Sequence, residues 1–258
     1  MRLLQYNSTG KLSLASFSNN NLPPYAILSH TWGDENEEIL YRNVVEETYE
    51  DKKGYRKIRF CGEQASRDGL QYFWVDTCCI DKSSSAELSE AILRMFSWYR
   101  GAEKCYVYLS DVSTAKRKRG NPSPGPLWER AFRGSRWFTR GWTLQELIAP
   151  VVVEFFSADC VLLGDRASLK EVICDITGIH INAIQGKSLS SFSVSERIRW
   201  IQKRETKVEE DKVYSLLGIF GVQIPLLYGE GEEKAFTRLL RELKNGQDGE
   251  QIHCLIRI

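Results

Sequence analysis

Four short apolar runs, spaced along the first 160 residues, constrain the fold more than any other feature of this chain. They are YAILS (25–29), YFWVD (72–76), CYVYLSD (105–111) and VVVEFF (151–156). Continuous runs of this length, rich in β-branched and aromatic residues, are typical of strands buried on both faces of a sheet. Helical patterns separate the runs, and strands joined by helical crossovers form parallel sheets. We therefore predict an α/β fold in which helices flank a parallel sheet.

The helical patterns carry end signals as well as periodicity. Ser84 and Glu87 have the spacing of a capping box, which predicts the start of a long helix, and Gly101 is placed to end it. Ser193 and Glu196 repeat the signature farther along the chain. Strands and helices therefore alternate first, and helical patterns follow.

This change of pattern predicts how the 258 residues are divided. We expect an α/β core over 1–165, an appended C-terminal helical subdomain over 166–245, and a tail or linker to further domains over 246–258. A loop at 113–135 interrupts the core. Its basic, proline-rich stretch AKRKRGNPSPGP (115–126) is interpreted as a solvated loop tip, with a nuclear signal as the alternative.

Composition excludes several classes of function. The formal net charge of +1 provides no electrostatic attraction for nucleic acid or for an anionic membrane. No stretch approaches the roughly 20 apolar residues of a membrane span. The opening MRLLQYNSTGK does not have the apolar segment of a secretory signal. We therefore predict a cytoplasmic protein with no membrane span and no nucleic-acid partner.

The seven cysteines and three histidines do not have the spacing of a zinc site. The number of cysteines is odd, and the adjacent Cys78 and Cys79 are not a Cys-x-x-Cys pair. We therefore predict buried reduced thiols, no metal and no cofactor.

A ligand site is expected at one edge of the sheet. In open α/β sheets, ligands bind outside the carboxyl ends of the strands, near the point where the strand order reverses. Segments 30–34, 76–81 and 110–111 follow predicted strands and meet at that edge. The predicted short helix GWTLQEL (141–147) must cross back over the sheet, which brings its single acid, Glu146, close to the same edge.

Long blocks of the sequence resemble one protein family. The blocks are LSHTWGD, FWVDTCCIDK, ELSEAILRMFSWYRGAEKCYVYLSDV, SRWFTRGWTLQELIAP and KRETKVEEDKVYSLLGIFGVQIPLLYGEGEEKAF. They are similar to successive blocks of the fungal heterokaryon-incompatibility (HET) domain, over about residues 23–240. The resemblance implies a cell-death effector at the N-terminus of a fungal NOD-like receptor. It also implies self-association by clustering, with nucleotide-switch and repeat domains elsewhere in the same receptor.

Two segments also resemble TIR domains, distantly. YAILSHTWG is similar to the first TIR strand and its loop, and CYVYLSD, SRW and GWTLQEL are similar to the third strand and its W-C-x-x-E-L helix. The resemblance implies a TIR-like, flavodoxin-like core and places on Glu146 the glutamate that enzymatic TIR domains need for NAD hydrolysis. The chain departs from TIR domains at Thr143, which replaces the motif cysteine, at the loop 113–135, and in the helices after about residue 165.

The chemistry of NAD hydrolysis is compatible with one carboxylate and an aromatic wall. Its transition state is oxocarbenium-like, as in glycoside hydrolysis, and nicotinamide leaves as a neutral molecule. We therefore predict NAD or NADP as substrate and Glu146 as the catalytic residue. The predicted substrate-binding residues are Ser29, His30, Trp32, Asp76, Asp81 and Trp142.

Each candidate also has a structural interpretation. Glu146 could instead pair with Arg140 or cap a loop. The tryptophans could pack in the core, His30 could bond to the backbone, and the aspartates could hold Asx turns. Arg204 and the acids at 205 and 209–211 are interpreted as a solvated charge cluster, or alternatively as an assembly surface.

Two functions follow from these observations. The first is a TIR-like enzyme that consumes NAD(P), and the second is a non-catalytic module that oligomerises and triggers death through a partner. Membrane disruption is disfavoured because the amphipathic helices carry apolar faces that a globular core can absorb.

Overall fold

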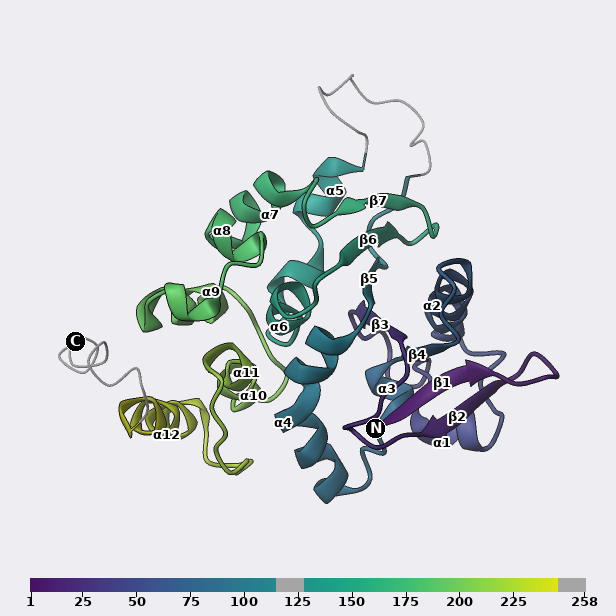
Figure 1. Ribbon diagram of the computed structural model, residues 1–258, viewed down its shortest axis with the longest axis horizontal. Coiled ribbons are helices and arrows are strands. Elements are labelled where there is room, and N and C mark those ends of the chain that lie inside the picture. The colour runs from purple at the N-terminus through teal and green to yellow at the C-terminus, as the bar shows by residue number, and fades with distance from the viewer. Residues whose placement is uncertain (115–127, 246–258) are drawn as a thin grey trace.

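The computed structural model describes residues 1–114 and 128–245. Its centre is a seven-stranded sheet with the order β2-β1-β4-β3-β5-β6-β7 (Figure 1). The strands are β1 (Arg2–Tyr6), β2 (Leu12–Ser16), β3 (Tyr25–His30), β4 (Tyr72–Trp74), β5 (Lys104–Leu109), β6 (Val153–Ser157) and β7 (Leu162–Asp165).

The four predicted apolar runs form the middle of the sheet. Strands β4, β3, β5 and β6 lie side by side in that order and are parallel. In chain order the four parallel strands are arranged 2-1-3-4, which agrees with flavodoxin-like sheets and places the reversal between β3 and β5. All six residues of β3 are buried. Burial on both faces explains why these strands read as continuous apolar runs, and the predicted α/β class is confirmed.

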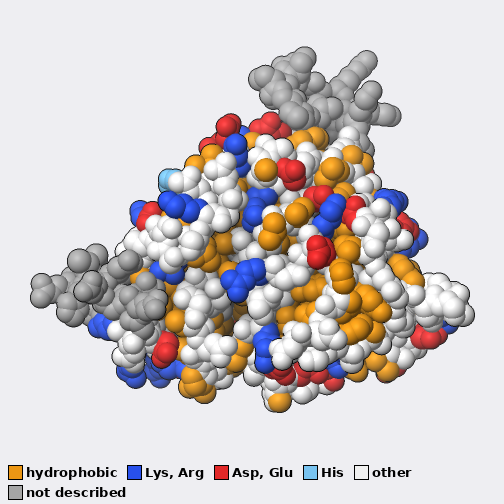
Figure 2. Space-filling view, in the orientation of Figure 1, with side chains coloured by type: hydrophobic (Ala, Val, Ile, Leu, Met, Phe, Trp, Pro, Cys, Tyr) orange, Lys and Arg blue, Asp and Glu red, His pale blue; other side chains and the backbone are white. Residues whose placement is uncertain are grey.

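The sheet is mixed and not purely parallel, as three further strands are antiparallel to their neighbours. β1 and β2 form a hairpin, β1 also pairs with β4, and β7 pairs with β6. These three strands were not predicted from the sequence, because they are short and only partly buried, so their apolar runs are interrupted. Figure 2 shows hydrophobic side chains gathered over the β1–β2 hairpin, whereas charges of both signs are interspersed elsewhere on this face.

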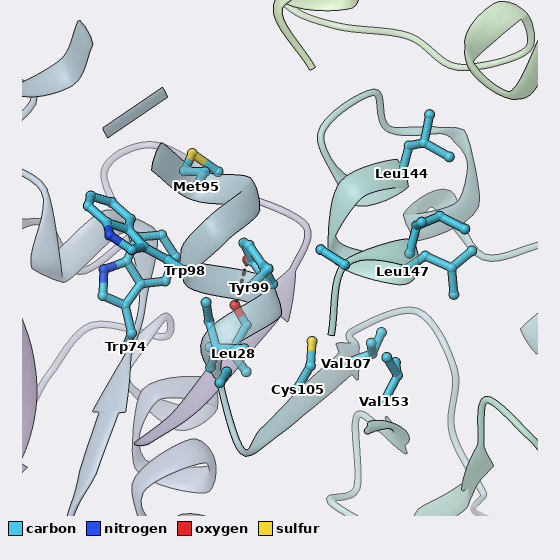
Figure 3. Close-up of a cluster of buried hydrophobic side chains, with 14 of the residues drawn as sticks. Leu28, Trp74, Met95, Trp98, Tyr99, Cys105, Val107, Leu144, Leu147 and Val153 are labelled. Carbon is cyan, nitrogen blue, oxygen red and sulfur yellow. Dashed lines mark hydrogen bonds between the residues drawn. The ribbon is translucent and has the colours of Figure 1, made fainter. Parts of the chain in front are cut away.

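Helices cover both faces of the sheet. In the first part these are α1 (Tyr41–Val45), α2 (Tyr55–Arg67), α3 (Asp76–Cys79), α4 (Ser85–Gly101), α5 (Glu129–Arg133), the 3₁₀ turn η1 (Arg136–Thr139) and α6 (Thr143–Ile148). Phe60 of α2 packs against Tyr106 and Tyr108 of β5. Cys105 and Val107, which alternate with these tyrosines along β5, point toward α4 and α6 instead (Figure 3). This alternation follows from the two-residue period of a strand.

The two predicted capping boxes differ in the structure. At α4 the Ser84 hydroxyl accepts from the Glu87 amide, but the Glu87 carboxylate bonds to the Asp81 amide and Arg2. Half of that box is therefore present. Ser193 and Glu196 form both halves at the start of α9. The reason for the difference is that a tertiary partner, Arg2 of β1, competes for the Glu87 carboxylate.

The helical extension continues from β7. It contains α7 (Lys170–Thr177), α8 (Ile181–Ile184), η2 (Leu189–Ser191), α9 (Val194–Gln202), α10 (Asp211–Tyr214), α11 (Leu217–Phe220) and α12 (Glu232–Asn245). Val213 and Tyr214 of α10 and Leu217, Ile219 and Phe220 of α11 are buried. Helix α11 packs on α4, and a β-bridge joins Arg140 to Glu205. The extension is thus docked on the α/β core (Figure 1).

Gly218 of α11 lies close against Phe96 of α4. A Cβ added at Gly218 would lie 2.2 Å from the Cβ of Phe96, which cannot move without its backbone. We expect Gly218→Ala to lower the free energy of unfolding by about 3 kcal/mol, because overpacking forces the two helices apart. Urea unfolding measures this. Gly134→Ala is the matched control, since its Cβ meets nothing closer than 3.7 Å. Equal stability of the two variants would contradict the close packing of α11 on α4.

Two segments discussed from the sequence, the basic stretch 115–126 and the tail 246–258, lie outside the described residues. Within the described part, no helix is long and apolar enough to cross a membrane, and no group of three or more His, Cys, Asp or Glu side chains is arranged to hold a metal. The described cysteines are free thiols; four are buried, and Cys160 and Cys174 are half-buried.

Candidate functional site

The expected edge of the sheet is formed by the carboxyl ends of β3 and β5. β3 ends at His30, and Thr31 and Trp32 follow it. β5 ends at Leu109 and is followed by Ser110. The hydroxyls of Thr31 and Ser110 lie 3.4 Å apart, which places the two loops in contact where the strand order reverses.

Glu146 lies against β3, close to this edge. All six residues of α6 are buried, and the helix contacts both β3 and α4. The Ser29 hydroxyl of β3 donates to Oε2 of Glu146, and the indole Nε1 of Trp137 donates to the Ser29 oxygen over 2.7 Å. Glu146 is 6% exposed. Its carboxyl is therefore enclosed and oriented by a buried serine and a buried tryptophan.

Buried apolar side chains pack around α6. Leu144 and Leu147 of this helix are buried, and Leu147 lies near Val107 of β5 (Figure 3). Tyr99 of α4, whose hydroxyl donates to the carbonyl of Leu28, lies beside Cys105 of β5 (Figure 3). Burial raises the pKa of Glu146 to about 8; hydrogen bonding from Ser29 opposes the rise, and the charge of Asp76 adds to it. At neutral pH the carboxyl is therefore mainly protonated, and it ionises at mildly alkaline pH.

Asp76 is the centre of a second cluster at the same edge. Its Oδ1 lies 3.0 Å from Nε2 of His30, and its Oδ2 accepts from Nε1 of Trp32 and from Nζ of Lys82, each over 3.1 Å. Burial acts to raise the pKa of Asp76, but Lys82 and His30 outweigh it and hold that pKa well below its usual range. Asp76 is thus an ionised carboxylate that ties the loop after β3 to the start of α3.

Trp32 presents an aromatic face to solvent. It is 36% exposed, Nζ of Lys82 lies 3.6 Å from its ring centroid, and Nζ of Lys207 lies 5.9 Å from a ring centroid. The loop beneath is held by Glu38, which accepts from the Gly33 amide and from Lys57. Trp32 is therefore a fixed aromatic wall with two cations beside it.

The structure does not bring two of the predicted residues into these clusters. Asp81 accepts from the amide and hydroxyl of Ser83 in its own turn. Trp142 precedes the first helical residue of α6, and its Nε1 donates to Asp211 of α10 over 3.1 Å. Trp142 therefore joins the core to the extension, whereas Ser29, His30, Trp32 and Asp76 are placed at the sheet edge with Glu146.

The predicted solvated charge cluster is wrong for Arg204 and Glu210, which are both buried at 3% exposure. Nη1 of Arg204 donates to the carbonyl of Arg140 and to Oγ1 of Thr143. Glu210 accepts from the amides of Gly229 and Gly231. A hydrophilic run carries no signal of burial, because these charges are satisfied by partners distant in sequence.

Two cavities in the described part of the chain lie away from Glu146. One, of about 230 Å³, lies beside Trp74, and the other, of about 380 Å³, lies beside Pro24; Trp98 lines both. Neither includes Glu146 or a residue of 30–34. Glu146 itself is largely enclosed by protein, with 6% of its surface exposed.

Comparison with known proteins decides the family. A model described as Heterokaryon incompatibility protein (HET) matches residues 25–129. The vegetative incompatibility protein HET-E-1 of Podospora anserina is 55% identical over 251 residues, which is 96% of this chain. The chain carries a HET domain. It spans 18% of the length of HET-E-1, and no solved structure matches it significantly. Glu146 and Arg204 of the HET domain lie beyond the segment that the family model matches.

Proposed function

We propose that this HET domain is the effector part of a protein that acts in heterokaryon incompatibility, and that it hydrolyses NAD or NADP at the nicotinamide–ribose bond. The first part rests on the likeness to HET-E-1, whose name describes vegetative incompatibility. The second rests on Glu146, a buried carboxyl with a raised pKa beside the point where the strand order reverses. Strongly perturbed carboxyls at such positions are candidates for catalysis.

The reaction adds water to the anomeric carbon of the ribose and releases nicotinamide and one proton. As the bond to nicotinamide breaks, the positive charge of the pyridinium passes to the ribose ring. An ionised Glu146 beside that ring stabilises the charge, and Ser29 orients the carboxylate by its hydrogen bond. The rate is therefore expected to rise as Glu146 ionises.

The second cluster fits the binding of the rest of the dinucleotide. Trp32 offers an exposed ring for stacking, and Lys82 and Lys207 place positive charge beside it. Asp76 holds this loop through His30 and Trp32. We assign Trp32 to substrate contact, and His30 and Asp76 to fixing the loop.

Nicotinamide release by the purified domain tests the proposal. We expect release when the domain is fused to a chemically induced dimeriser or tetrameriser and clustered, and much slower release from the dispersed domain at equal concentration. Chromatography of the reaction quantifies nicotinamide and ADP-ribose, with NAD and NADP supplied separately. An absence of product from the clustered domain would contradict hydrolysis.

A second function has its own supporting observation. Glu146 is enclosed and internally hydrogen-bonded, which also suits a structural carboxyl in a non-catalytic module that oligomerises and acts through a partner. This module would be toxic in a fungal or yeast host without releasing nicotinamide. Since this chain spans 18% of HET-E-1, we propose that nucleotide-switch and repeat domains of the same receptor would drive the clustering.

A further inference from the structure

Arg204 is a buried cation that the helical extension brings to α6. It follows α9, is 3% exposed, and bonds through Nη1 to the carbonyl of Arg140 over 2.9 Å and to Oγ1 of Thr143 over 2.8 Å. Within the described residues its Nη2 has no hydrogen-bond partner. A buried guanidinium with an unpaired group is costly unless a nearby negative charge compensates it.

Hydrogen bonds on either side of Trp137, to its backbone carbonyl and from its indole, connect Arg204 to Glu146. The Thr143 hydroxyl that accepts from Arg204 donates to the carbonyl of Trp137 over 2.6 Å. Trp137 donates to Ser29, and Ser29 donates to Glu146. Thr143 also precedes Glu146 by one helical turn, so the two side chains lie on neighbouring positions of α6. Arg204 is therefore linked to the carboxyl both through α6 and through Trp137 and Ser29.

We propose that Arg204 is a positioning residue of the candidate site, which anchors the start of α6 and supplies the positive charge that favours the ionised form of Glu146. Its effect on catalysis rests on the proposed hydrolysis of NAD(P). Its effect on the ionisation of Glu146 does not. The helical extension is then part of the site and not an appendage to it.

Besides Arg204, the neighbouring groups that act on Glu146 are neutral or negatively charged. Tyr99 of α4 and Cys105 of β5 are neutral near pH 7 because burial raises the pKa of each well above its usual value. Ser29 of β3 is uncharged. Asp76 of α3 is ionised, and its charge disfavours a second carboxylate nearby. Asp76 itself is paired with Lys82 and His30. The charge of Arg204 interacts with Glu146 and acts on that carboxyl in the direction opposite to Asp76.

The test compares substitutions at Arg204 that keep or remove the charge. In a ¹³C NMR titration of the Glu146 carboxyl, we expect Arg204→Met to raise the midpoint by about one pH unit, because an opposite charge nearby shifts a carboxyl by about this amount. The ionised fraction at pH 7 then falls about tenfold. Arg204→Lys is expected to stay close to the wild-type midpoint. Arg199→Met, on the exposed side of α9, is the matched control.

The titration and the activity separate the two proposals. If hydrolysis is correct, the pH profile of nicotinamide release moves upward in Arg204→Met by the same amount and recovers in Arg204→Lys. If the wild type releases no nicotinamide, hydrolysis fails while the titration still tests Arg204. An unchanged midpoint in Arg204→Met, or equal shifts in both variants, would overturn the role of its charge. Arg204→Gln, which keeps polar donors, provides the same measurement if Arg204→Met does not fold.

Discussion

Glu146→Gln is expected to reduce nicotinamide release from the clustered domain at least about a hundredfold. The amide has the shape of the carboxyl and can accept the hydrogen bond that Ser29 donates to Glu146. It has no negative charge at any pH, so it cannot stabilise a positively charged ribose ring. Losing one preorganised electrostatic contact of this kind costs about 10²–10³ in rate. Initial rates over a pH series measure the effect, and the difference between variant and wild type should widen toward pH 8.

The control for this variant lies at the opposite edge of the sheet. Glu103 is exposed just before β5, and Glu103→Gln makes the same chemical change far from the carboxyl ends of the strands. We expect it to retain the wild-type rate. If Glu146→Gln also retains that rate, Glu146 has no catalytic role. If Glu146→Gln remains toxic in cells while it releases no nicotinamide, the non-catalytic module is favoured.

The stability of the wild type is expected to fall between about pH 5 and pH 8. Burial raises the pKa of Glu146 from 4.5 to about 8, so in this window the folded state holds a proton that the unfolded state has lost. The native state then binds more protons, and the free energy of unfolding decreases as the pH rises. The full difference amounts to about 5 kcal/mol from this one group. Asp76 acts in the opposite direction, but its lowered pKa affects stability only at acid pH, below this window.

The same Glu146→Gln variant isolates this contribution to stability. Glutamine does not ionise, so the variant and the wild type should be similarly stable at pH 5. At pH 8 the variant should be more stable by several kcal/mol. Urea unfolding of both proteins at pH 5, 6, 7 and 8 measures the difference. A difference that stays constant over this range would show that Glu146 is not buried with a raised pKa.

The fold was predictable where local sequence and tertiary environment agree. β3 and β5 lie in the middle of the sheet, and their burial requires apolar residues on both faces, which makes them visible as runs. β7 was missed because its residues are half-buried or exposed at the sheet edge. The Glu87 carboxylate was misassigned because its choice of Arg2 depends on a strand far away in sequence.

The candidate site was likewise predictable from the sequence only in part. The order of strands and helices was enough to predict that Glu146 crosses back to the carboxyl end of the first parallel strand, where Ser29 lies. Neither Trp137 nor Arg204 was predicted at this site, since no periodic pattern links residues 29, 137, 146 and 204. Trp142 was expected beside Glu146, but Asp211 of the extension holds its indole.

The sequence by itself determined the α/β class, the parallel middle of the sheet and the place of Glu146 near its carboxyl edge. Periodicity and the handedness of crossovers are local properties of the chain, and they suffice for this. Only the tertiary structure decided the ionisation of Glu146 and the burial of Arg204. Both depend on how much water is excluded and on which charges meet, and these are set when α4, α6 and the helical extension pack together.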